Sequence, residues 1–247
     1  MTASQPTILA TSGGLRRGSR TSLEFGPLLH YALELSRPEG SRPRLCHLGT
    51  AGGDQRSFNA EFSAAGELAN VSVCHLNLFP MPSYDQMEEV LLSQDVIWVG
   101  GGSVANLLAI WQIHGLYDIF PRVWQAGVVL AGVSAGSLCW HVGGTTDSYG
   151  PTLRPVTNGL ALLPYSNGVH YDSEPQRRPL YQRLIAEGTI PPGYATDDGV
   201  GLHYRGVEMV EAVSEQDGKS AYYVEREGDV ARERAIPTRR LPETHVA

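Results

Sequence analysis

The sequence predicts an α/β fold built on a doubly wound, mostly parallel sheet. From the N-terminus to residue 140, short apolar and β-branched segments alternate with segments of helical character, and glycines follow several of the apolar segments. Short buried strands that alternate with helices are typical of a parallel sheet covered on both faces, and right-handed crossovers favour the doubly wound order. The glycines then mark the carboxyl ends of the strands, where such sheets bind their ligands.

The expected elements follow one another regularly along the chain. Strands are expected at 7–12, 44–48, 71–78, 96–99 and 128–133, and helices at 22–36, 55–69, 84–93 and 103–114. After residue 150 the pattern loosens. Two late strands at 206–213 and 221–224 are expected to flank a turn at 216–219, as an antiparallel edge or a small β layer.

Length and charge exclude several classes of protein. The 247 residues carry 19 Lys and Arg against 26 Asp and Glu, so the formal net charge is −7. We expect a single domain over 1–247, with its core at about 7–225 and a frayed, charged tail at about 232–247. An acidic chain lacks the basic surface that attracts nucleic acid or anionic membranes. Neither a membrane-spanning run nor a signal peptide is recognised, so we expect a cytoplasmic protein. A homodimer is possible, but the sequence does not decide the oligomeric state.

The three cysteines, Cys46, Cys74 and Cys139, lie in apolar stretches and are odd in number. We expect buried, reduced thiols rather than disulfides. Neither CxxC nor HExxH occurs, so we expect no metal and no cofactor.

A GxSxG pentapeptide joins the strand expected at 128–133 to a helix-like segment, and its central residue is Ser134. This is the setting of a nucleophile elbow, a tight turn that holds a serine hydroxyl outward in strained backbone geometry. The flanking residues must be small, as Gly132, Ala135 and Gly136 are. The amide after the serine then faces a developing oxyanion. A phosphate-binding loop is less favoured, because no GxxxxGK[ST] motif occurs.

A serine nucleophile requires a histidine base and an acid that orients it. Of the eight histidines, His170 is the first candidate, because it follows an apolar run and lies at an expected strand end. Three acids compete for the third role. Asp197 and Asp198 share a turn at another strand end, whereas Asp147 would follow the Ser…Asp…His order of the α/β-hydrolases but lies too few residues before His170.

These motifs together resemble peptidase E, the α-aspartyl dipeptidase family of serine peptidases, which is related to cyanophycinase. The resemblance covers roughly residues 7–225. The segments that carry it appear in family order: GGGSVANLL at 100–108, AGVSAGS at 131–137, TTD at 145–147, NGVHYD at 167–172 and ATDDG at 195–199.

The resemblance implies a flavodoxin-like sandwich similar to the class I glutamine amidotransferases, and a Ser…His…acid triad. The family nucleophile falls on Ser134 and the base on His170. The family acid, usually Glu, falls on Asp198, which is a shorter carboxylate. The family's oxyanion donors fall on the backbone of Gly102 and Ala135.

The resemblance also implies a substrate, a dipeptide with an N-terminal aspartate. In the family, a basic residue downstream of the catalytic histidine pairs with the aspartate side chain. Arg177 is the closest match and Arg178 is nearly as good. The family often has Asn after the glycine triplet, where this chain has Ser103, and this departure puts strict aspartate selectivity in doubt more than hydrolysis.

Two alternatives stay open. The same triad could serve a cyanophycinase-like or other hydrolase, and a cyanophycinase should need acidic groups to receive arginine. The same glycine-lined crevice could also belong to a non-catalytic, amidotransferase-like module that binds a small ligand, since fold alone does not establish catalysis.

Overall fold

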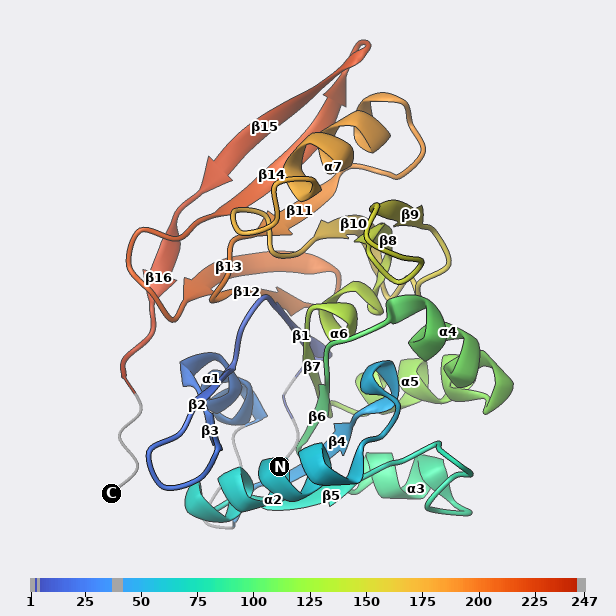
Figure 1. Ribbon diagram of the computed structural model, residues 1–247, viewed down its shortest axis with the longest axis vertical. Helices are drawn as coiled ribbons and strands as arrows, with labels where there is room; N and C mark the ends of the chain where they lie inside the picture. The colour runs from blue at the N-terminus through green and yellow to red at the C-terminus, as the bar shows by residue number, and fades with distance from the viewer. Residues whose placement is uncertain (1–2, 4, 37–41, 244–247) are drawn as a thin grey trace.

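The structure, a computed structural model, describes residues 3, 5–36 and 42–243. Its main sheet has eight strands in the order β16-β13-β12-β1-β7-β6-β4-β5 (Figure 1). Five neighbouring strands, β1, β7, β6, β4 and β5, are parallel to one another. Strand β12 is antiparallel to both of its neighbours, β1 and β13. The bounds are β1 Thr7–Thr11, β4 Arg44–Leu48, β5 Ser72–His75, β6 Val96–Val99, β7 Val129–Val133, β12 Val200–Arg205, β13 Glu208–Ser214 and β16 Thr238–Arg240.

Helices cover both faces of this sheet. Successive side chains of a strand point to opposite faces, and in β1 and β6 all of them are buried, so both faces need a covering layer. In β1, Leu9 belongs to a core cluster with α1 and α2, while Ile8 and Ala10 belong to another with α4 and α5. The prediction of a doubly wound α/β fold is therefore confirmed. The helices are α1 Pro27–Ser36, α2 Arg56–Leu68, α3 Met87–Leu92, α4 Val104–Ile113 and α5 Leu116–Gln125, with a 3₁₀ turn η1 at Thr50–Gly52.

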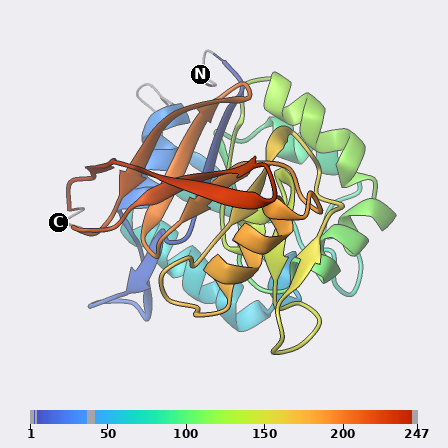
Figure 2. The same cartoon turned by 90° about the horizontal axis from the view of Figure 1, so that it is seen from above.

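A second sheet of six strands, in the order β15-β14-β11-β10-β8-β9, lies above the first in Figure 1. Helix α7 (Arg177–Ala186) packs against it through Tyr181 and Ile185, and Figure 2 shows this helix beside the long β14–β15 hairpin. The bounds are β8 His141–Thr146, β9 Arg154–Val156, β10 Leu163–Gly168, β11 Gly193–Thr196, β14 Ala221–Glu227 and β15 Val230–Ile236.

Three sequence-based expectations about the fold are wrong in detail. The helix expected at 22–36 begins at Pro27, because β3 (Leu23–Phe25) instead pairs with β2 (Leu15–Arg17). The two late strands do not form a hairpin with each other. Instead, β13 pairs with β12 and β16, and β14 pairs with β11 and β15.

The third correction concerns the expected tail at 232–247. Strand β15 pairs with β14 along its whole length, β16 pairs with β13, and Leu241 is buried. Arg232 and Arg234 of β15 are exposed, whereas Glu233 between them accepts hydrogen bonds from Arg178 and Gln182 of α7. Composition alone does not distinguish such a charged edge strand from a solvated tail. Residues 244–247 of that prediction lie outside the described part of the chain.

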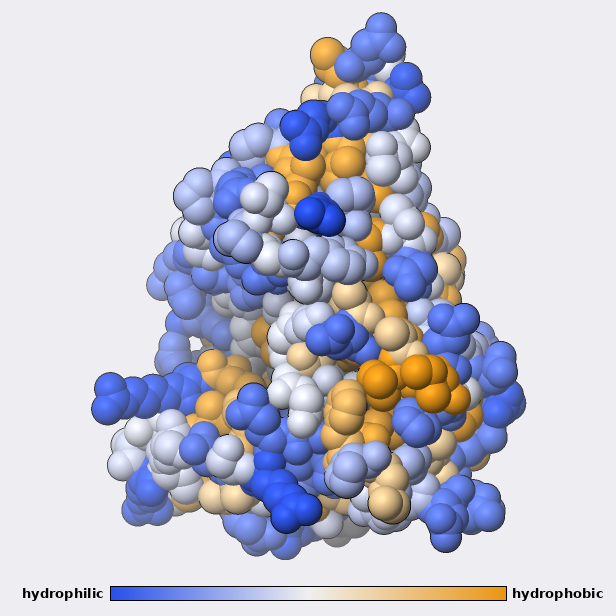
Figure 3. Space-filling view, turned by 45° about the vertical axis from the view of Figure 1, so that its right-hand side comes forward, coloured by the Kyte–Doolittle hydropathy of each residue, from blue (hydrophilic) through white to orange (hydrophobic). Residues whose placement is uncertain are grey.

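The surface is hydrophilic over much of the face seen in Figure 3, with hydrophobic residues gathered in a few areas. Three large hydrophobic side chains on the side of α3 and α4, Phe79, Met81 and Ile113, are exposed. No helix within the described residues combines the length and the apolar character that crossing a bilayer requires.

Candidate active site

Ser134 occupies the tight turn between β7 and the short helix α6 (Ala135–Leu138). Its φ of 58° and ψ of −111° are a conformation that residues with a side chain rarely adopt, and such strain costs about 1–3 kcal/mol. Hydrogen bonds hold the turn on both sides. The Ser134 N–H donates to the Thr11 carbonyl at 3.0 Å, and the Ser134 carbonyl accepts from the Ser137 and Leu138 N–H groups at 2.9 Å.

The glycines on either side of Ser134 leave no room for a side chain. A Cβ on Gly132 would lie 2.5 Å from the Gly136 carbonyl oxygen, and a Cβ on Gly136 would lie 2.1 Å from the Val99 carbonyl oxygen. Both distances are well inside van der Waals contact. The requirement for small residues that the pentapeptide predicts therefore has a direct steric cause.

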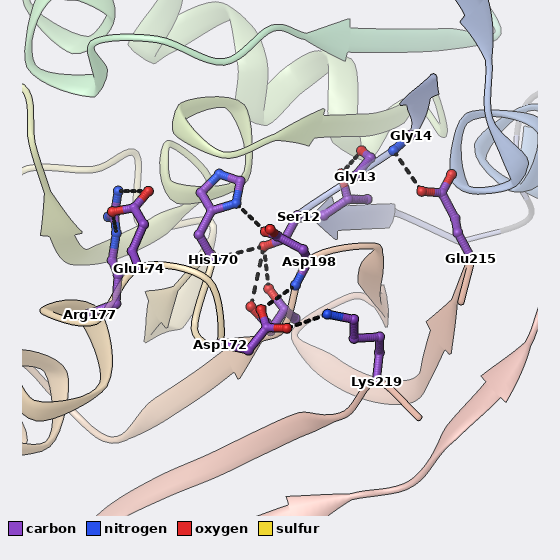
Figure 4. Close-up of polar contacts among 12 residues, drawn as sticks. Ser12, Gly13, Gly14, His170, Asp172, Glu174, Arg177, Asp198, Glu215 and Lys219 are labelled. Atoms are coloured by element: carbon purple, nitrogen blue, oxygen red, sulfur yellow. Dashed lines mark hydrogen bonds and ion pairs between the residues drawn. The ribbon is translucent and has the colours of Figure 1, made fainter. Parts of the chain in front are cut away.

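His170 lies two residues after β10, and its side chain faces Asp198 from the loop after β11. Its Nδ1 is 2.5 Å from Asp198 Oδ1 (Figure 4). Since a carboxylate can only accept, Nδ1 carries the proton and Nε2 is left to accept one. His170 also has a positive φ of 53°. Its N–H donates to Ser12 Oγ at 3.2 Å, which anchors this unusual backbone beside the end of β1.

The side chain of Asp172 holds the backbone of Asp198 in place. The Asp198 N–H donates to Asp172 Oδ1 at 2.9 Å, and the other oxygen of Asp172 pairs with Lys219. Asp172 thus binds the backbone of the loop that carries Asp198.

The other two candidate acids lie elsewhere. Asp197 Oδ2 accepts from the Ser220 N–H at 3.0 Å and from the Tyr222 hydroxyl at 3.4 Å, and burial raises the pKa of this carboxyl. The Asp147 side chain is 61% exposed and lies 3.9 Å from an Arg177 nitrogen. Among the three, Asp198 is the carboxylate that the described structure brings to His170.

Ser134 and His170 line the same cleft, which has a volume of about 310 Å³. Because Ser134 comes from the first sheet and His170 from the second, the cleft lies where the two sheets meet. The lining residues are Gly102, Ser103, Ser134, Asp147, Ser148, His170, Glu174 and Arg177.

Backbone N–H groups near Ser134 are available to a ligand. In the described chain, the N–H groups of Gly102 and Ala135 make no hydrogen bond with another residue. Gly102 has a φ of +135°, and a Cβ there would lie 2.3 Å from the Ala51 carbonyl oxygen, so this position requires glycine. Next to it, Ser103 caps α4 by accepting the Asn106 N–H at 3.2 Å, which leaves its hydroxyl proton free to donate.

The two candidate arginines differ sharply in environment. Arg177 lines the cleft and is only 3% exposed. Its Nε and Nη2 donate to the two oxygens of Glu174 at 2.7 and 3.2 Å, and its Nη1 donates to the Thr145 carbonyl at 2.5 Å.

Arg178 faces away from the cleft. It pairs with Glu233, and its guanidinium lies over the rings of Tyr171 and Tyr222, 5.1 and 4.7 Å from their centroids. Arg178 therefore ties α7 to β15 through Glu233. Arg177 lines the cleft and Arg178 does not, so Arg177 is the arginine within reach of a ligand at Ser134.

The residues that support these groups are not predicted by the sequence motifs. Ser12 and Glu174 contact His170 and Arg177 directly. Ser12 lies at the end of the first strand, immediately before Gly13 and Gly14, and this position at the carboxyl edge of the sheet could have identified it as a site residue. Nothing in the sequence pattern distinguishes Glu174 from a surface carboxylate.

The described residues contain no cluster of three or more His, Cys, Asp or Glu side chains that could hold a metal ion. Cys46, Cys74 and Cys139 are free thiols, and Cys46 and Cys139 are buried.

Comparison with known proteins decides the family. The model of peptidase family S51 matches residues 8–212. The chain belongs to peptidase family S51. It is 40% identical over 217 residues to the uncharacterized peptidase YgaJ of Bacillus subtilis (strain 168), covering 88% of this chain and 91% of that protein. It is 29% identical over 177 residues to peptidase E of Actinobacillus pleuropneumoniae, covering 67% and 73%.

The fold also has solved counterparts. The crystal structure of a peptidase from an acI-B1 Actinobacterium superposes with a TM-score of 0.66, at 16% sequence identity, over 95% of each chain. The family match and the relatives named as peptidases confirm the resemblance to peptidase E that the motifs indicate, and with it the peptidase class. The S51 match spans the glycine triplet, the elbow, His170 and Asp198.

Proposed function

We propose that this S51 protein is a serine peptidase that hydrolyses dipeptides with an N-terminal aspartate. Ser134 is the nucleophile, His170 the base and Asp198 the acid that orients the base. The observation that supports this most strongly is the convergence, at one cleft, of a strained serine with a histidine whose Nδ1 lies 2.5 Å from a carboxylate. A positioned base beside an outward hydroxyl is the arrangement that activates a serine.

In the proposed reaction, the Ser134 oxygen attacks the peptide carbonyl while His170 Nε2 takes its proton. Asp198 stabilises the imidazolium and fixes the tautomer. The C–N bond then breaks, and His170 returns the proton to the leaving amine. Water, activated by the same imidazole, attacks the acyl-enzyme and releases the N-terminal amino acid.

The N–H groups of Gly102 and Ala135 supply the oxyanion hole. Both are unpaired in the described structure, and both belong to residues next to or lining the cleft. A donor of this kind contributes about 3–4 kcal/mol to transition-state stabilisation in other hydrolases. Because both donors are backbone N–H groups, their stabilisation of the oxyanion depends on the conformation of the two loops and not on the identity of a side chain.

Arg177 is the group that would bind the aspartate side chain. A guanidinium has five N–H donors, and three are used in the structure, so two remain for a ligand carboxylate. Glu174 fixes the guanidinium plane, which prepares it for bidentate recognition. Ser103 can donate a further hydrogen bond with shorter reach than asparagine.

A second candidate substrate is favoured by the carboxylates of the cleft. Asp147 and Glu174 both line it, against the single cation of Arg177. This excess of negative charge suits an ammonium or guanidinium group, as in the β-linked aspartyl–arginine units that cyanophycinase cleaves. The same excess would also receive the free α-ammonium group of an N-terminal aspartate.

The test is a substrate panel with the purified protein: Asp-Leu, Glu-Leu, Ala-Leu and β-Asp-Arg. The proposal expects the highest kcat/KM on Asp-Leu. A highest value on β-Asp-Arg would establish the second candidate instead. Hydrolysis of none of the four, by a folded protein, would contradict both and support the ligand-binding alternative.

A further inference from the structure

The carboxyl end of β1 is hydrogen-bonded to the backbone at or beside every member of the proposed triad. The Thr11 carbonyl accepts the N–H of the nucleophile, Ser134, at 3.0 Å. The Ser12 carbonyl accepts the N–H of Gly199, the residue after the proposed acid, at 2.9 Å. The Ser12 hydroxyl accepts the N–H of the base, His170, at 3.2 Å. Two consecutive residues therefore reach all three members.

Only one of these three hydrogen bonds uses a side chain. The bonds to the carbonyls of Thr11 and Ser12 continue the pairing of β1 with β7 and β12, so they do not depend on which side chains these residues carry. The His170 N–H, by contrast, is bound by the side-chain oxygen of Ser12. The identity of residue 12 therefore matters for how the base is held, and much less for the nucleophile or the acid.

The Ser12 hydroxyl is buried and has a second partner. Ser12 is 4% exposed, and its Oγ lies 2.7 Å from Oγ1 of Thr196, the last residue of β11. A hydroxyl offers one proton and two acceptor positions, so it can bond Thr196 and still accept from His170. The Thr196 carbonyl accepts the N–H of Tyr171, the residue after His170, at 3.0 Å. Ser12 and Thr196 together thus bind two successive N–H groups of the loop that carries the base.

The loop after Ser12 is held on its other side by Glu215. One carboxylate oxygen of Glu215 accepts the Gly14 N–H at 3.2 Å (Figure 4), and the other accepts the Leu28 N–H at 2.9 Å. Gly13 has no room to shift, since a Cβ there would lie 2.7 Å from Glu215 Oε2. The position of the Ser12 hydroxyl is therefore set by the first sheet and its neighbours, and the His170 loop must conform to it.

The backbone of His170 has particular need of an external partner. Its φ of 53° lies in a region that residues with a side chain seldom adopt. Such a conformation persists only where the surrounding structure imposes it. Without the Ser12 oxygen, the His170 N–H would lose its hydrogen bond, and the loop could relax to a backbone conformation that directs the imidazole elsewhere.

We propose that Ser12 is a positioning residue, whose hydroxyl holds the His170 N–H and so sets the imidazole between Ser134 and Asp198. Ser12 is not among the residues that line the cleft, so it acts through His170 and not on the substrate. The inference rests on the proposed peptidase function, because it assigns a residue to the service of the same triad.

The first test needs no turnover. In protein labelled with ¹⁵N-histidine, the ring-nitrogen resonances of His170, assigned by their absence in His170→Gln, report which nitrogen carries the proton. We expect the Nδ1–H form in the wild type, because Nδ1 lies 2.5 Å from a carboxylate oxygen of Asp198. Ser12→Ala should shift the ring toward the Nε2–H form. A folded Ser12→Ala protein with unchanged His170 resonances would overturn the proposal.

Ser166→Ala is the matched control. Ser166 is a fully buried serine on β10, the strand that leads to His170, and its hydroxyl lies 2.8 Å from the Tyr181 hydroxyl and 2.6 Å from the Pro191 carbonyl oxygen. The substitution thus removes a buried hydroxyl with two partners that are not members of the triad. It should lower the melting temperature yet leave the His170 resonances unchanged. An equal shift in both variants would show a general loss of packing, and would overturn the role of Ser12.

The second test is kinetic. We expect Ser12→Ala to lower kcat on Asp-Leu by about 100-fold, as misplacing a catalytic group by about 1 Å does, with KM within a few-fold of the wild type. Ser12→Cys, which keeps a weak acceptor of similar size, should have a kcat between those of the wild type and Ser12→Ala. If Ser12→Ala does not fold, Ser12→Cys carries both readouts. An unchanged kcat, or a loss confined to KM, would overturn the positioning role.

The two tests separate this role from the peptidase proposal. Wild-type turnover in Ser12→Ala, with unchanged ring resonances, overturns the role of Ser12 and leaves the peptidase intact. If the wild-type protein cleaves no dipeptide, the peptidase proposal fails, and the ¹⁵N resonances alone decide whether Ser12 positions the His170 ring against Asp198.

Discussion

His170 and Asp198 follow two neighbouring parallel strands, β10 and β11, and their side chains meet with Nδ1 2.5 Å from Oδ1. The pair thus belongs entirely to the second sheet. Ser134 belongs to the first sheet, and the hydrogen bond from the His170 N–H to Ser12 Oγ fastens the second sheet to the end of β1. The relative position of nucleophile and base therefore depends on how the two sheets pack.

Asp198→Asn should lower kcat by about four orders of magnitude, as the same change of the orienting carboxylate does in another triad. An amide at this position can donate to Nδ1 and so favours the wrong tautomer. Asp197→Asn, one residue away and bonded to Ser220 and Tyr222, is the matched control and should stay within a few-fold of the wild type. Equal losses in the two variants would contradict the role of Asp198.

Ser134→Gly should abolish peptidase activity and raise the free energy of unfolding by about 1 kcal/mol. The reason is that glycine adopts a φ of 58° without the strain that a serine side chain meets there. Denaturant unfolding measures the change. A less stable Ser134→Gly variant would show that the elbow stores no strain.

Arg177→Lys should reduce kcat/KM on Asp-Leu by about tenfold or more, and on Ala-Leu much less, because lysine lacks the bidentate fork. Arg178→Lys, the adjacent residue outside the cleft, should leave the ratio between the two substrates unchanged. Thermal unfolding of both variants checks that the fold survives the loss of a buried guanidinium. An unchanged ratio in a folded Arg177→Lys variant would remove Arg177 from substrate recognition.

The protein should lose stability as the pH falls from about 6.5 to about 4. Burial lowers the pKa of His141 from 6.5 to about 4, and between these values the unfolded chain binds a proton that the folded chain does not. Unfolding is therefore favoured as the pH falls through this window, by on the order of 2–3 kcal/mol for one such histidine.

His141→Asn tests this origin of the acid sensitivity. It removes the titrating ring and can still donate to the Ser137 carbonyl, to which His141 Nδ1 is hydrogen-bonded at 2.9 Å. The variant should show a flatter dependence of unfolding free energy on pH between 4 and 6.5 than the wild type. An unchanged slope in His141→Asn would assign the acid sensitivity to other groups.

Local chemistry was predictable from the sequence, because it depends on neighbours along the chain. The elbow at Ser134 follows from the spacing of Gly132 and Gly136 around it, and the main parallel sheet follows from alternating apolar strands and helices. The order of His170 and Asp198 was supplied by the family resemblance, and pattern alone left Asp197 open. Only the direction of the loop after β11 decides between them.

Long-range pairing was not predictable in the same way. The edge strand β15 has the composition of a solvated tail, and its partner β14 does not form the expected pair with β13 but pairs with β11 on its other side. Arg177 and Arg178 are adjacent and chemically identical, so their separation into a cleft residue and a strut to Glu233 follows only from the orientation of α7.

The most direct test of the proposed nucleophile is labelling with a fluorophosphonate, followed by peptide mapping. The account predicts one adduct per chain, on Ser134, that disappears in Ser134→Ala and forms far more slowly in His170→Ala. A folded wild-type protein that takes up no label, or an adduct that persists unchanged in Ser134→Ala, would contradict it.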